Sequence, residues 1–268
     1  LFYINMKKKK RERKRKAVKK NFQKRVSKQS NSKKIERILT GIPNFDSLIE
    51  GGFKKNSTNI IVGSSGSGKT IFSAQFLIAG LKKNEKCLYI TFEEKKEQFY
   101  KDMARFGWDL ESFEKKGLFI FLEYTPAKVK TMLEEGGGEI ENVLVKEKIS
   151  RVVIDSITSF ALLFENELEK REAALELFNM IKNWNCTSLV TLEEDPSKKD
   201  DTGHSIEFES DSIILFYFVR NANRRSRYLE ILKMRGTNHS KEVHEFEIGK
   251  KGLSVTKKAS KNPPIPQR

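Results

Sequence analysis

Apolar residues gather in short, uninterrupted runs along the middle of the chain. These runs predict five buried strands, at residues 59–63, 87–92, 118–122, 152–157 and 187–192. The segments between them predict helices, because apolar residues recur there at i, i+3, i+4 and i+7: Ala74, Leu77, Ile78 and Leu81 in one helix, and Ala174, Leu177, Phe178 and Ile181 in a longer helix near 165–184. A charged amphipathic helix is also expected to end near Phe106. Apolar strands that alternate with helices are typical of a parallel sheet covered on both faces.

The last third of the chain follows another pattern. Residues 212–219, 228–234 and 243–248 read as strands joined by short polar turns, with no helical spacing between them. Such strands extend a sheet in the antiparallel sense, because short turns cannot make the crossover that parallel strands need. The predicted fold class is therefore α/β, with a mainly parallel, helix-covered sheet and a C-terminal antiparallel β extension.

The composition fits a folded, water-soluble chain, with 37% apolar and 33% charged residues among 268. No apolar run reaches the roughly 20 residues that span a bilayer. The two cysteines, Cys87 and Cys186, each begin an apolar run and read as buried thiols. We expect a cytoplasmic location without a membrane span. We also expect one folded domain over residues 35–256, between a disordered basic arm (1–34) and a disordered tail (257–268).

The formal net charge of +16 is concentrated at the N-terminus. Residues 1–40 hold 17 basic and 2 acidic residues, whereas residues 41–249 hold 29 basic and 34 acidic ones. A run such as KKKKRERKRKAVKK (7–20) attracts polyanions, so we expect it to bind nucleic acid phosphates. A solubilising tail and an anionic membrane surface are alternative interpretations of the same run.

Residues 63–70, GSSGSGKT, match the phosphate-binding P-loop pattern between a predicted strand and a predicted helix. The glycines let backbone N–H groups point at phosphate oxygens, and the N-terminus of the helix adds its dipole. We expect Lys69 to reach the β- and γ-phosphates of a nucleotide and Thr70 to ligate Mg²⁺. The nucleotide-binding residues predicted from this loop are Gly63, Ser64, Ser65, Gly66, Ser67, Gly68, Lys69 and Thr70.

Carboxylates at the ends of other predicted strands complete the expected site. Asp155 ends an apolar strand, as the aspartate that holds a water on Mg²⁺ does in P-loop proteins. Glu93 and Glu94 follow the strand after the P-loop helix, at the edge where open parallel sheets bind ligands. We expect these two to be the catalytic carboxylates. The alternative is that Glu93 and Glu94 are only solvated charges at a strand end. A second pair, Glu193 and Glu194, closes a later strand in the same way.

Residues 233–236, KMRG, place two cations two positions apart on a predicted strand. Lys233 and Arg235 would share one face while Met234 points into the core. Two such cations can form a fork for an anion, or they can be solvated charges on an edge strand. The spacing alone leaves both interpretations open.

Six segments occur in order along the chain: TGIPNFDSLIEGGF (40–53), GSSGSGKT (63–70), LYITFEE (88–94), FGWDLE (106–111), RVVIDSIT (151–158) and KMRGTNHS (233–240). Together they resemble the KaiC-like branch of the RecA superfamily of ATPases, in the single-domain form common in archaea. The resemblance implies a RecA-type fold, ATP with Mg²⁺, and a homo-oligomeric ring, usually a hexamer, with nucleotide between subunits. It also implies that Glu93 and Glu94 act on the attacking water. Lys233 and Arg235 would reach the γ-phosphate held by the neighbouring subunit.

The chain departs from this family pattern in ways that bear on its role. It has one such domain where the clock protein that names the family has two, and no counterpart of that protein's phosphorylated pair is assigned. The segments that carry DNA contacts in recombinase and helicase relatives are acidic here: residues 159–172 hold four acidic and two basic residues, and 193–205 hold five and two. A nucleic-acid-lined pore should instead be basic or carry stacking groups.

We therefore expect a slowly turning-over, Mg-dependent ring ATPase with a regulatory or DNA repair- or recombination-associated role. Two alternatives stay open. One is an ATP-dependent oligomeric switch that presents a surface to a protein partner. The other is a kinase that acts on itself or on a partner.

Overall fold

The computed structural model describes residues 35–125, 128, 131, 138–161, 164, 166–196, 209–221, 223–261, 263 and 265. The fold reported below is that of the compact unit Arg37–Arg268. The basic arm predicted for residues 1–34 lies outside the described residues, as does most of the acidic segment 193–205.

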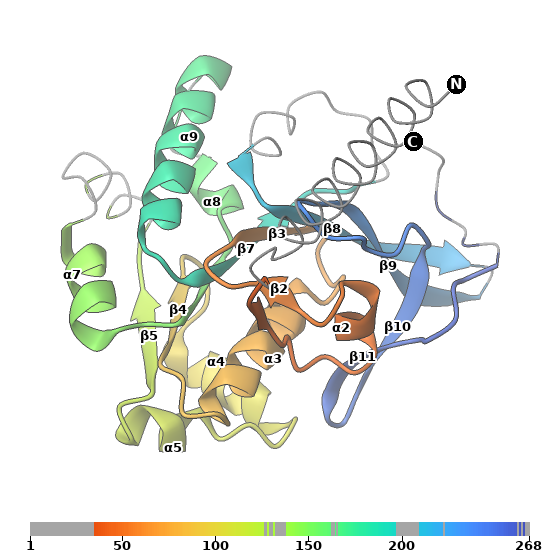
Figure 1. Ribbon diagram of the computed structural model, residues 1–268, viewed down its shortest axis with the longest axis horizontal. Coiled ribbons are helices and arrows are strands. Elements are labelled where there is room, and N and C mark those ends of the chain that lie inside the picture. Colours follow the sequence, from red (N-terminus) through yellow and green to blue (C-terminus); the bar gives the residue numbers. More distant parts are fainter. Residues whose placement is uncertain are drawn as a thin grey trace, which may run out of the picture. The chain divides into compact units, whose positions relative to one another are not determined.

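A twisted sheet of nine strands forms the centre of the described unit (Figure 1). In spatial order its strands are β11 (Gly252–Val255), β10 (His244–Gly249), β9 (Arg224–Met234), β8 (Ser212–Asn221), β3 (Thr58–Gly63), β7 (Thr187–Glu193), β6 (Arg151–Asp155), β4 (Cys87–Thr91) and β5 (Phe119–Glu123). The strands from β8 to β5 are parallel, and β8, β9, β10 and β11 pair antiparallel in sequence. This confirms the predicted fold class. A second, two-stranded sheet pairs β1 (Arg37–Ile38) with β2 (Phe53–Lys54).

Helices cover both faces of the sheet. One core contains residues of α2 (Phe45–Leu48), α3 (Lys69–Leu81), α4 (Lys96–Ala104) and α5 (Leu110–Lys115). The core on the other face contains residues of α7 (Gly138–Glu147) and α9 (Glu167–Asn183). The short helix α8 (Thr158–Ala161) follows β6. Fully buried side chains of the strands alternate between the two cores, as the period of two in a strand requires.

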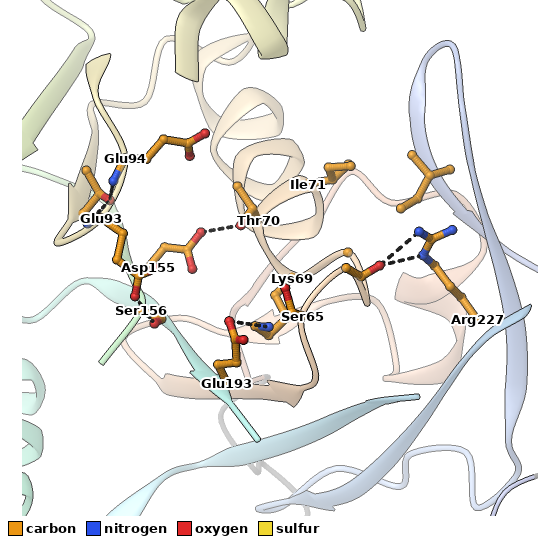
Figure 2. A pocket seen from close by; sticks show the side chains of 14 residues that line it. Ser65, Lys69, Thr70, Ile71, Glu93, Glu94, Asp155, Ser156, Glu193 and Arg227 are labelled. Carbon is orange, nitrogen blue, oxygen red and sulfur yellow. Dashed lines mark hydrogen bonds and ion pairs between the residues drawn. The ribbon is translucent and has the colours of Figure 1, made fainter. Parts of the chain in front are cut away.

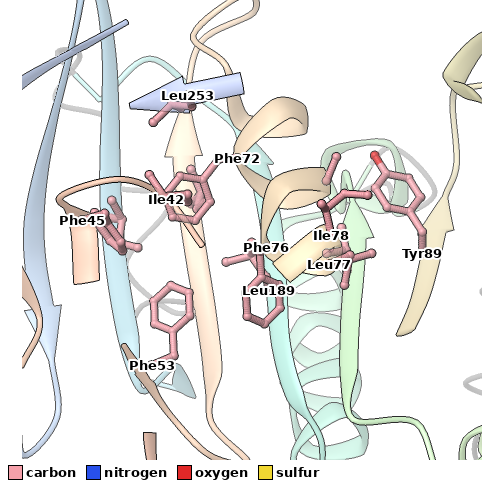
Figure 3. Packing of buried hydrophobic residues seen from close by; sticks show 14 of the residues in the cluster. Ile42, Phe45, Phe53, Phe72, Phe76, Leu77, Ile78, Tyr89, Leu189 and Leu253 are labelled. Atoms are coloured by element: carbon pink, nitrogen blue, oxygen red, sulfur yellow. The ribbon is translucent and has the colours of Figure 1, made fainter. Parts of the chain in front are cut away.

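Aromatic side chains fill the core beside α3 (Figure 3). The ring of Phe72 on α3 meets Phe45 and Phe216 edge-on, at centroid separations of 5.1 and 5.5 Å. Phe76 meets Phe53 in the same way at 5.8 Å. Edge-to-face contacts of this kind favour one arrangement of the helix, because each ring edge meets the negative face of its neighbour. The start of α3, which carries the P-loop lysine, is thereby held against the sheet.

Some predicted elements differ from the observed ones. Helix α3 is buried on nearly every side, although its spacing predicts one apolar face. On its polar side Gln75 is buried against two other segments: its amide donates to the carbonyls of Gly41 and Leu253 (both 3.1 Å) and accepts from the Leu253 N–H (2.7 Å). The segment 159–172, which corresponds to a DNA-contacting loop in recombinase and helicase relatives, contains part of α8 and the first turns of α9, the long helix predicted near 165–184.

Candidate nucleotide site

Four neighbouring parallel strands end at the same edge of the sheet, and one cavity is lined by the last residues of three of them and by the loop that follows the fourth. Gly63 at the end of β3 pairs with Glu193 of β7, and Thr91 at the end of β4 pairs with Asp155 of β6. The cavity has a volume of about 530 Å³, within the usual range of small-molecule sites. It is lined by Ser65, Gly66, Gly68, Lys69, Thr70, Ile71, Thr91, Glu93, Glu94, Asp155, Ser156, Glu193, Arg227 and Ile248.

Glycine is required at three positions of the loop between β3 and α3, for reasons of backbone conformation and of space. Gly66 and Gly68 have φ angles of 74° and 107°, which only glycine adopts at little cost. A Cβ atom at Gly63 would lie 2.6 Å from Ser67 Oγ and 2.8 Å from Phe216 Cβ. The loop can therefore curl tightly over the end of β3 only with glycine at these positions.

Lys69 begins α3 and is almost fully buried beneath this loop. Its ammonium donates to the carbonyl oxygens of Gly63 (2.8 Å) and Ser64 (3.1 Å), and it lies 3.8 Å from a carboxylate oxygen of Glu193. Burial lowers the pKa of the Lys69 ammonium, and the negative charges of Glu193, Asp155 and Glu93 oppose that effect. The lysine is thus a point charge fixed inside the cavity (Figure 2).

Asp155 is held by hydroxyl groups from three elements. Thr70 Oγ1 and Tyr89 Oη each donate to Asp155 Oδ2 at 2.7 Å, and the Thr191 hydroxyl donates to Oδ1. Burial, together with the Asp155 charge, raises the pKa of the Tyr89 hydroxyl well above its usual value, so Tyr89 stays a donor. Thr70 and Asp155 therefore place two oxygen atoms side by side at the start of α3.

Glu93 and Glu94 both line the cavity, as their position beyond β4 predicts. Their backbone N–H groups donate to Thr91 Oγ1 at 3.2 and 3.1 Å, which turns the chain out of the strand. Glu93 Oε1 accepts hydrogen bonds from the hydroxyls of Ser156 (3.2 Å) and Ser159. Both carboxylates therefore face the same space although they are adjacent in sequence.

The two glutamates differ in their surroundings. Burial raises the pKa of the Glu94 carboxyl, and the negative charges of Asp155, Asp102 and Glu93 raise it further. Glu94 is half-buried, whereas Glu93 is exposed. A raised pKa brings a carboxylate closer to the basicity that proton abstraction near neutral pH requires.

Two charged cavity residues were not among the predicted site residues. Of the later glutamate pair it is Glu193 that lines the cavity, beside Lys69. Arg227 on β9 stacks on the Phe218 ring, with 4.3 Å from its guanidinium carbon to the ring centre, and donates to the Gly66 carbonyl at 3.0 and 3.1 Å. The pairing of β9 with β8 brings Arg227 here, and no local pattern signals it.

Lys233 and Arg235 lie at the opposite edge of the sheet and do not line the cavity. Strand β8 starts beside the start of β3, and Met234 at the end of β9 pairs with Ser212 at that same edge. From there to Gly63 is about four strand residues, or roughly 13 Å. Met234 is buried, as predicted, and Arg235 is exposed.

The charges near the fork agree with this position. The pKa of Glu209, a residue that precedes β8, is lowered chiefly by a hydrogen bond from Lys182, and Arg235 and Lys233 add to the effect. These cations therefore lie near the amino ends of the parallel strands, away from the P-loop of their own chain.

Comparison with known proteins decides the family. The family described as "ATPase: KaiC" matches residues 38–260. The chain belongs to the KaiC family of ATPases. In the solved structure of a KaiC-like protein from Pyrococcus horikoshii OT3, 99% of that chain superposes on 83% of this one, with a TM-score of 0.74 and 35% identity. The family assignment confirms the resemblance and implies that this KaiC-like domain binds nucleotide.

Two curated relatives differ in length. The "UPF0273 protein" of Thermotoga maritima is 33% identical over 234 residues, which cover 82% of this chain and 96% of that protein. The "Circadian clock protein KaiC3" of Synechocystis is 31% identical over 230 residues, and the KaiC-like domain spans 46% of its length. Within the part of the chain that the structure describes, no helix is both long and apolar enough to cross a bilayer.

Proposed function

We propose that the KaiC-like domain binds ATP with Mg²⁺ at the P-loop and hydrolyses it slowly, within a ring of identical subunits in which each subunit completes its neighbour's site. The observation that carries this proposal is the separation of the two cationic elements. Lys69 lies in the cavity at the carboxyl ends of the parallel strands, whereas Lys233 and Arg235 lie near the amino ends of these strands.

Magnesium suits the oxygen atoms at the start of α3. Mg²⁺ prefers hard oxygen ligands and keeps several waters, so one or two protein oxygens are enough beside the phosphates. The Thr70 hydroxyl and the Asp155 carboxylate supply them. The ion would neutralise charge on the phosphates. Among the described residues, no three histidine, cysteine or acidic side chains converge to make a cage for a metal.

Hydrolysis requires a group that orients water and accepts its proton beside the γ-phosphate. Glu93 and Glu94 face the cavity on the side opposite Arg227 (Figure 2). Ser156 and Ser159 hold the Glu93 carboxylate, and Glu94 has the raised pKa of the pair. We assign the proton-accepting role to these two glutamates, while Lys69 and the loop N–H groups hold the phosphates.

The fork would act between subunits. Phosphoryl transfer gains when a cation from a second protein or subunit approaches the γ-phosphate. Lys233 and Arg235 cannot reach the P-loop of their own chain, because β8 and β9 carry them to the other edge of the sheet. In a head-to-tail ring that edge can face the neighbour's P-loop, and such an interface closes by rotation.

Mixing two inactive variants tests this proposal. Arg235→Ala keeps the P-loop and loses the fork, whereas Lys69→Ala loses the P-loop lysine and keeps the fork. Mixed rings contain some interfaces with both halves sound, so ATPase activity should partly recover. Native mass spectrometry confirms that the rings are mixed. Mixed rings that stay as inactive as either variant would contradict completion in trans.

One observation favours a second function, autophosphorylation. The Ser159 and Ser156 hydroxyls donate to Glu93, the carboxylate assigned to proton transfer. A serine oxygen could replace water as the nucleophile. The γ-phosphoryl group would then pass to Oγ, the proton to Glu93, and ADP would leave. Incubation with γ-labelled ATP distinguishes the two, because hydrolysis releases labelled phosphate while the kinase labels the protein.

The regulatory or DNA-associated role rests on the charge of the N-terminal arm. Residues 1–40 carry 17 basic and 2 acidic residues. We propose that the arm binds nucleic acid phosphates, so deletion of residues 1–34 should remove most nucleic acid affinity and spare ATP binding. The affinity of the full chain should also fall steeply with salt. Retained nucleic acid affinity after the deletion would place the contacts elsewhere in the chain.

The alternative function, an ATP-dependent oligomeric switch, predicts stoichiometric nucleotide binding with little phosphate release.

A further inference from the structure

The turn after the fork is tied to a distant part of the chain by one guanidinium group. Arg37 in β1 donates from Nη2 to Thr237 Oγ1 at 3.1 Å, two residues beyond Arg235. About 200 positions separate the partners, so the contact exists only in the folded chain. The Arg37 side chain is 13% exposed, which makes the contact a part of the fold and not a surface encounter.

Arg37 is itself anchored on the loop between α2 and β2. Its Nη1 donates to the carbonyls of Ile49 (3.1 Å) and Gly52 (3.0 Å), and its Nη2 also donates to Glu50 Oε2 at 2.8 Å. A planar guanidinium with several donors in fixed directions suits this set of acceptors, and an ammonium cannot match it. The loop, β1 and the turn are therefore joined through one side chain.

The fork needs such support because the strand ends there. The β9 ladder stops at Met234, and a bulge at Leu232 already interrupts its pairing with β8. Beyond the ladder the Arg235 N–H donates to the Asp211 carbonyl at 2.8 Å, and the next residue, Gly236, has φ 64°. Farther along, the Ser240 N–H donates to the Leu48 carbonyl at 2.8 Å. Between these two contacts the Thr237 N–H closes the turn on the Met234 carbonyl at 3.3 Å, and Arg37 joins Thr237 to the loop between α2 and β2.

We propose that Arg37 is a positioning residue for the Lys233–Arg235 fork, acting through Thr237 on catalysis in the neighbouring subunit. This inference rests on the proposed completion in trans. A displacement of about 1 Å at a catalytic group can cost around 10²-fold in rate. Loss of Arg37 should thus reduce turnover while the subunit's own P-loop, at the other edge of the sheet, keeps its nucleotide affinity.

The first experiment measures kcat, KM and ATP affinity for full-length variants. Arg37→Ala should lower kcat by about 10- to 100-fold with little change in ATP Kd. Arg37→Lys should restore only part of kcat. Thr237→Val removes the acceptor at constant size and should lower kcat too. The Arg37→Ala/Thr237→Val double variant should have nearly the same kcat as Arg37→Ala, because both substitutions remove the same hydrogen bond.

Glu50→Gln keeps the contact between Arg37 and Thr237 and is the control, with near-parental kcat. Parental kcat in Arg37→Ala, or equal losses of kcat and ATP affinity, would overturn the proposal.

Mixing assigns the defect to one side of the interface. Arg37→Ala mixed with Lys69→Ala should recover activity, because its P-loop meets an intact fork. Arg37→Ala mixed with Arg235→Ala should not recover, because neither subunit supplies a well-placed fork. The reverse pattern would overturn the positioning role even if Arg235→Ala and Lys69→Ala complement each other. If that reference pair fails in confirmed mixed rings, completion in trans is itself wrong and the role of Arg37 falls with it.

Discussion

The parallel sheet has two functional edges, at the carboxyl ends and at the amino ends of its strands, and they differ in how many residues of the candidate site one chain supplies there. At the carboxyl edge, the P-loop after β3 and the ends of β4, β6 and β7 surround one cavity with the P-loop lysine inside it. At the amino edge, Lys233 near the end of β9 and Arg235 just after it lie near Glu209. Under the proposed function, the first edge binds the nucleotide, whereas the second supplies positive charge to the site of a neighbouring subunit.

This difference separates binding from turnover. Residues of the carboxyl edge should control whether ATP is held and, through Glu93 and Glu94, how its hydrolysis proceeds, whereas residues of the amino edge should control only how fast ATP reacts. A substitution at the amino edge that reduced ATP affinity as much as turnover would contradict the distinction. The following predictions test it from the largest expected effect to the smallest.

Lys69→Ala should have the largest effect, because the β- and γ-phosphates lose the positive charge buried beneath the P-loop. We expect ATP binding to fall below detection in calorimetry. Lys82→Ala, an exposed lysine just beyond the other end of α3, is the matched control and should bind ATP like the parent. Unchanged affinity in Lys69→Ala would remove the phosphate role of the cavity.

Arg235→Ala should leave ATP affinity nearly unchanged and reduce hydrolysis by about 10³-fold, the scale of a cationic finger in phosphoryl transfer. Phosphate release and calorimetry on the same preparation measure the two properties. Arg105→Ala, an exposed arginine after α4, controls for loss of charge. A matching loss of ATP affinity would mean that Lys233 and Arg235 also bind ATP before it reacts. The separation of nucleotide binding from turnover would then be wrong.

Changing Glu93 and Glu94 together to Gln should reduce hydrolysis by about 10²-fold or more while ATP still binds, because the amide keeps size and loses basicity. Single-turnover assays measure the chemical step directly. Glu97→Gln, exposed on α4, should behave like the parent. Full turnover in the double variant would direct attention to Glu193, which also lines the cavity.

Tyr89→Phe should destabilise the fold by about 1.5–3 kcal/mol, because a buried carboxylate loses one of its donors. Urea unfolding gives the difference. Tyr100→Phe is the comparison, since its hydroxyl donates to the partly exposed Glu114 and should matter less. Equal costs for the two would mean that the hydroxyls around Asp155 add nothing beyond an ordinary hydrogen bond.

The smallest effect expected is a pH dependence at Glu94. Its pKa is raised in the folded state, mainly by burial, so the folded chain holds that proton more tightly than the unfolded chain. The stabilisation from this proton is present below the unfolded pKa, near 4.5, and is lost as pH rises through the folded pKa. Glu94→Gln should therefore raise the melting temperature at pH 7, and the gain should vanish below pH 4.5. A gain independent of pH would show that ionisation is not its cause.

Much of the carboxyl edge could be predicted because its signals are local. The P-loop occupies consecutive residues between a strand and a helix, so Lys69 and Thr70 follow from the motif alone. Asp155, Glu93 and Glu94 follow from a rule about strand ends, since parallel strands place their carboxyl ends together. The alternation of apolar runs was sufficient for the parallel sheet and its antiparallel extension.

What only the tertiary structure decided depends on contacts between distant residues. Strand register brings Glu193 and Arg227 into the cavity and carries the fork to the other edge. Tyr89 and Arg151 read from the sequence as ordinary strand residues, yet one donates to Asp155 and the other is buried against Glu85. The link from Arg37 to Thr237 spans almost the whole domain. Periodicity along a chain reports which face of an element is buried, but it does not report which residue of another element will meet that face, because only packing and register determine that.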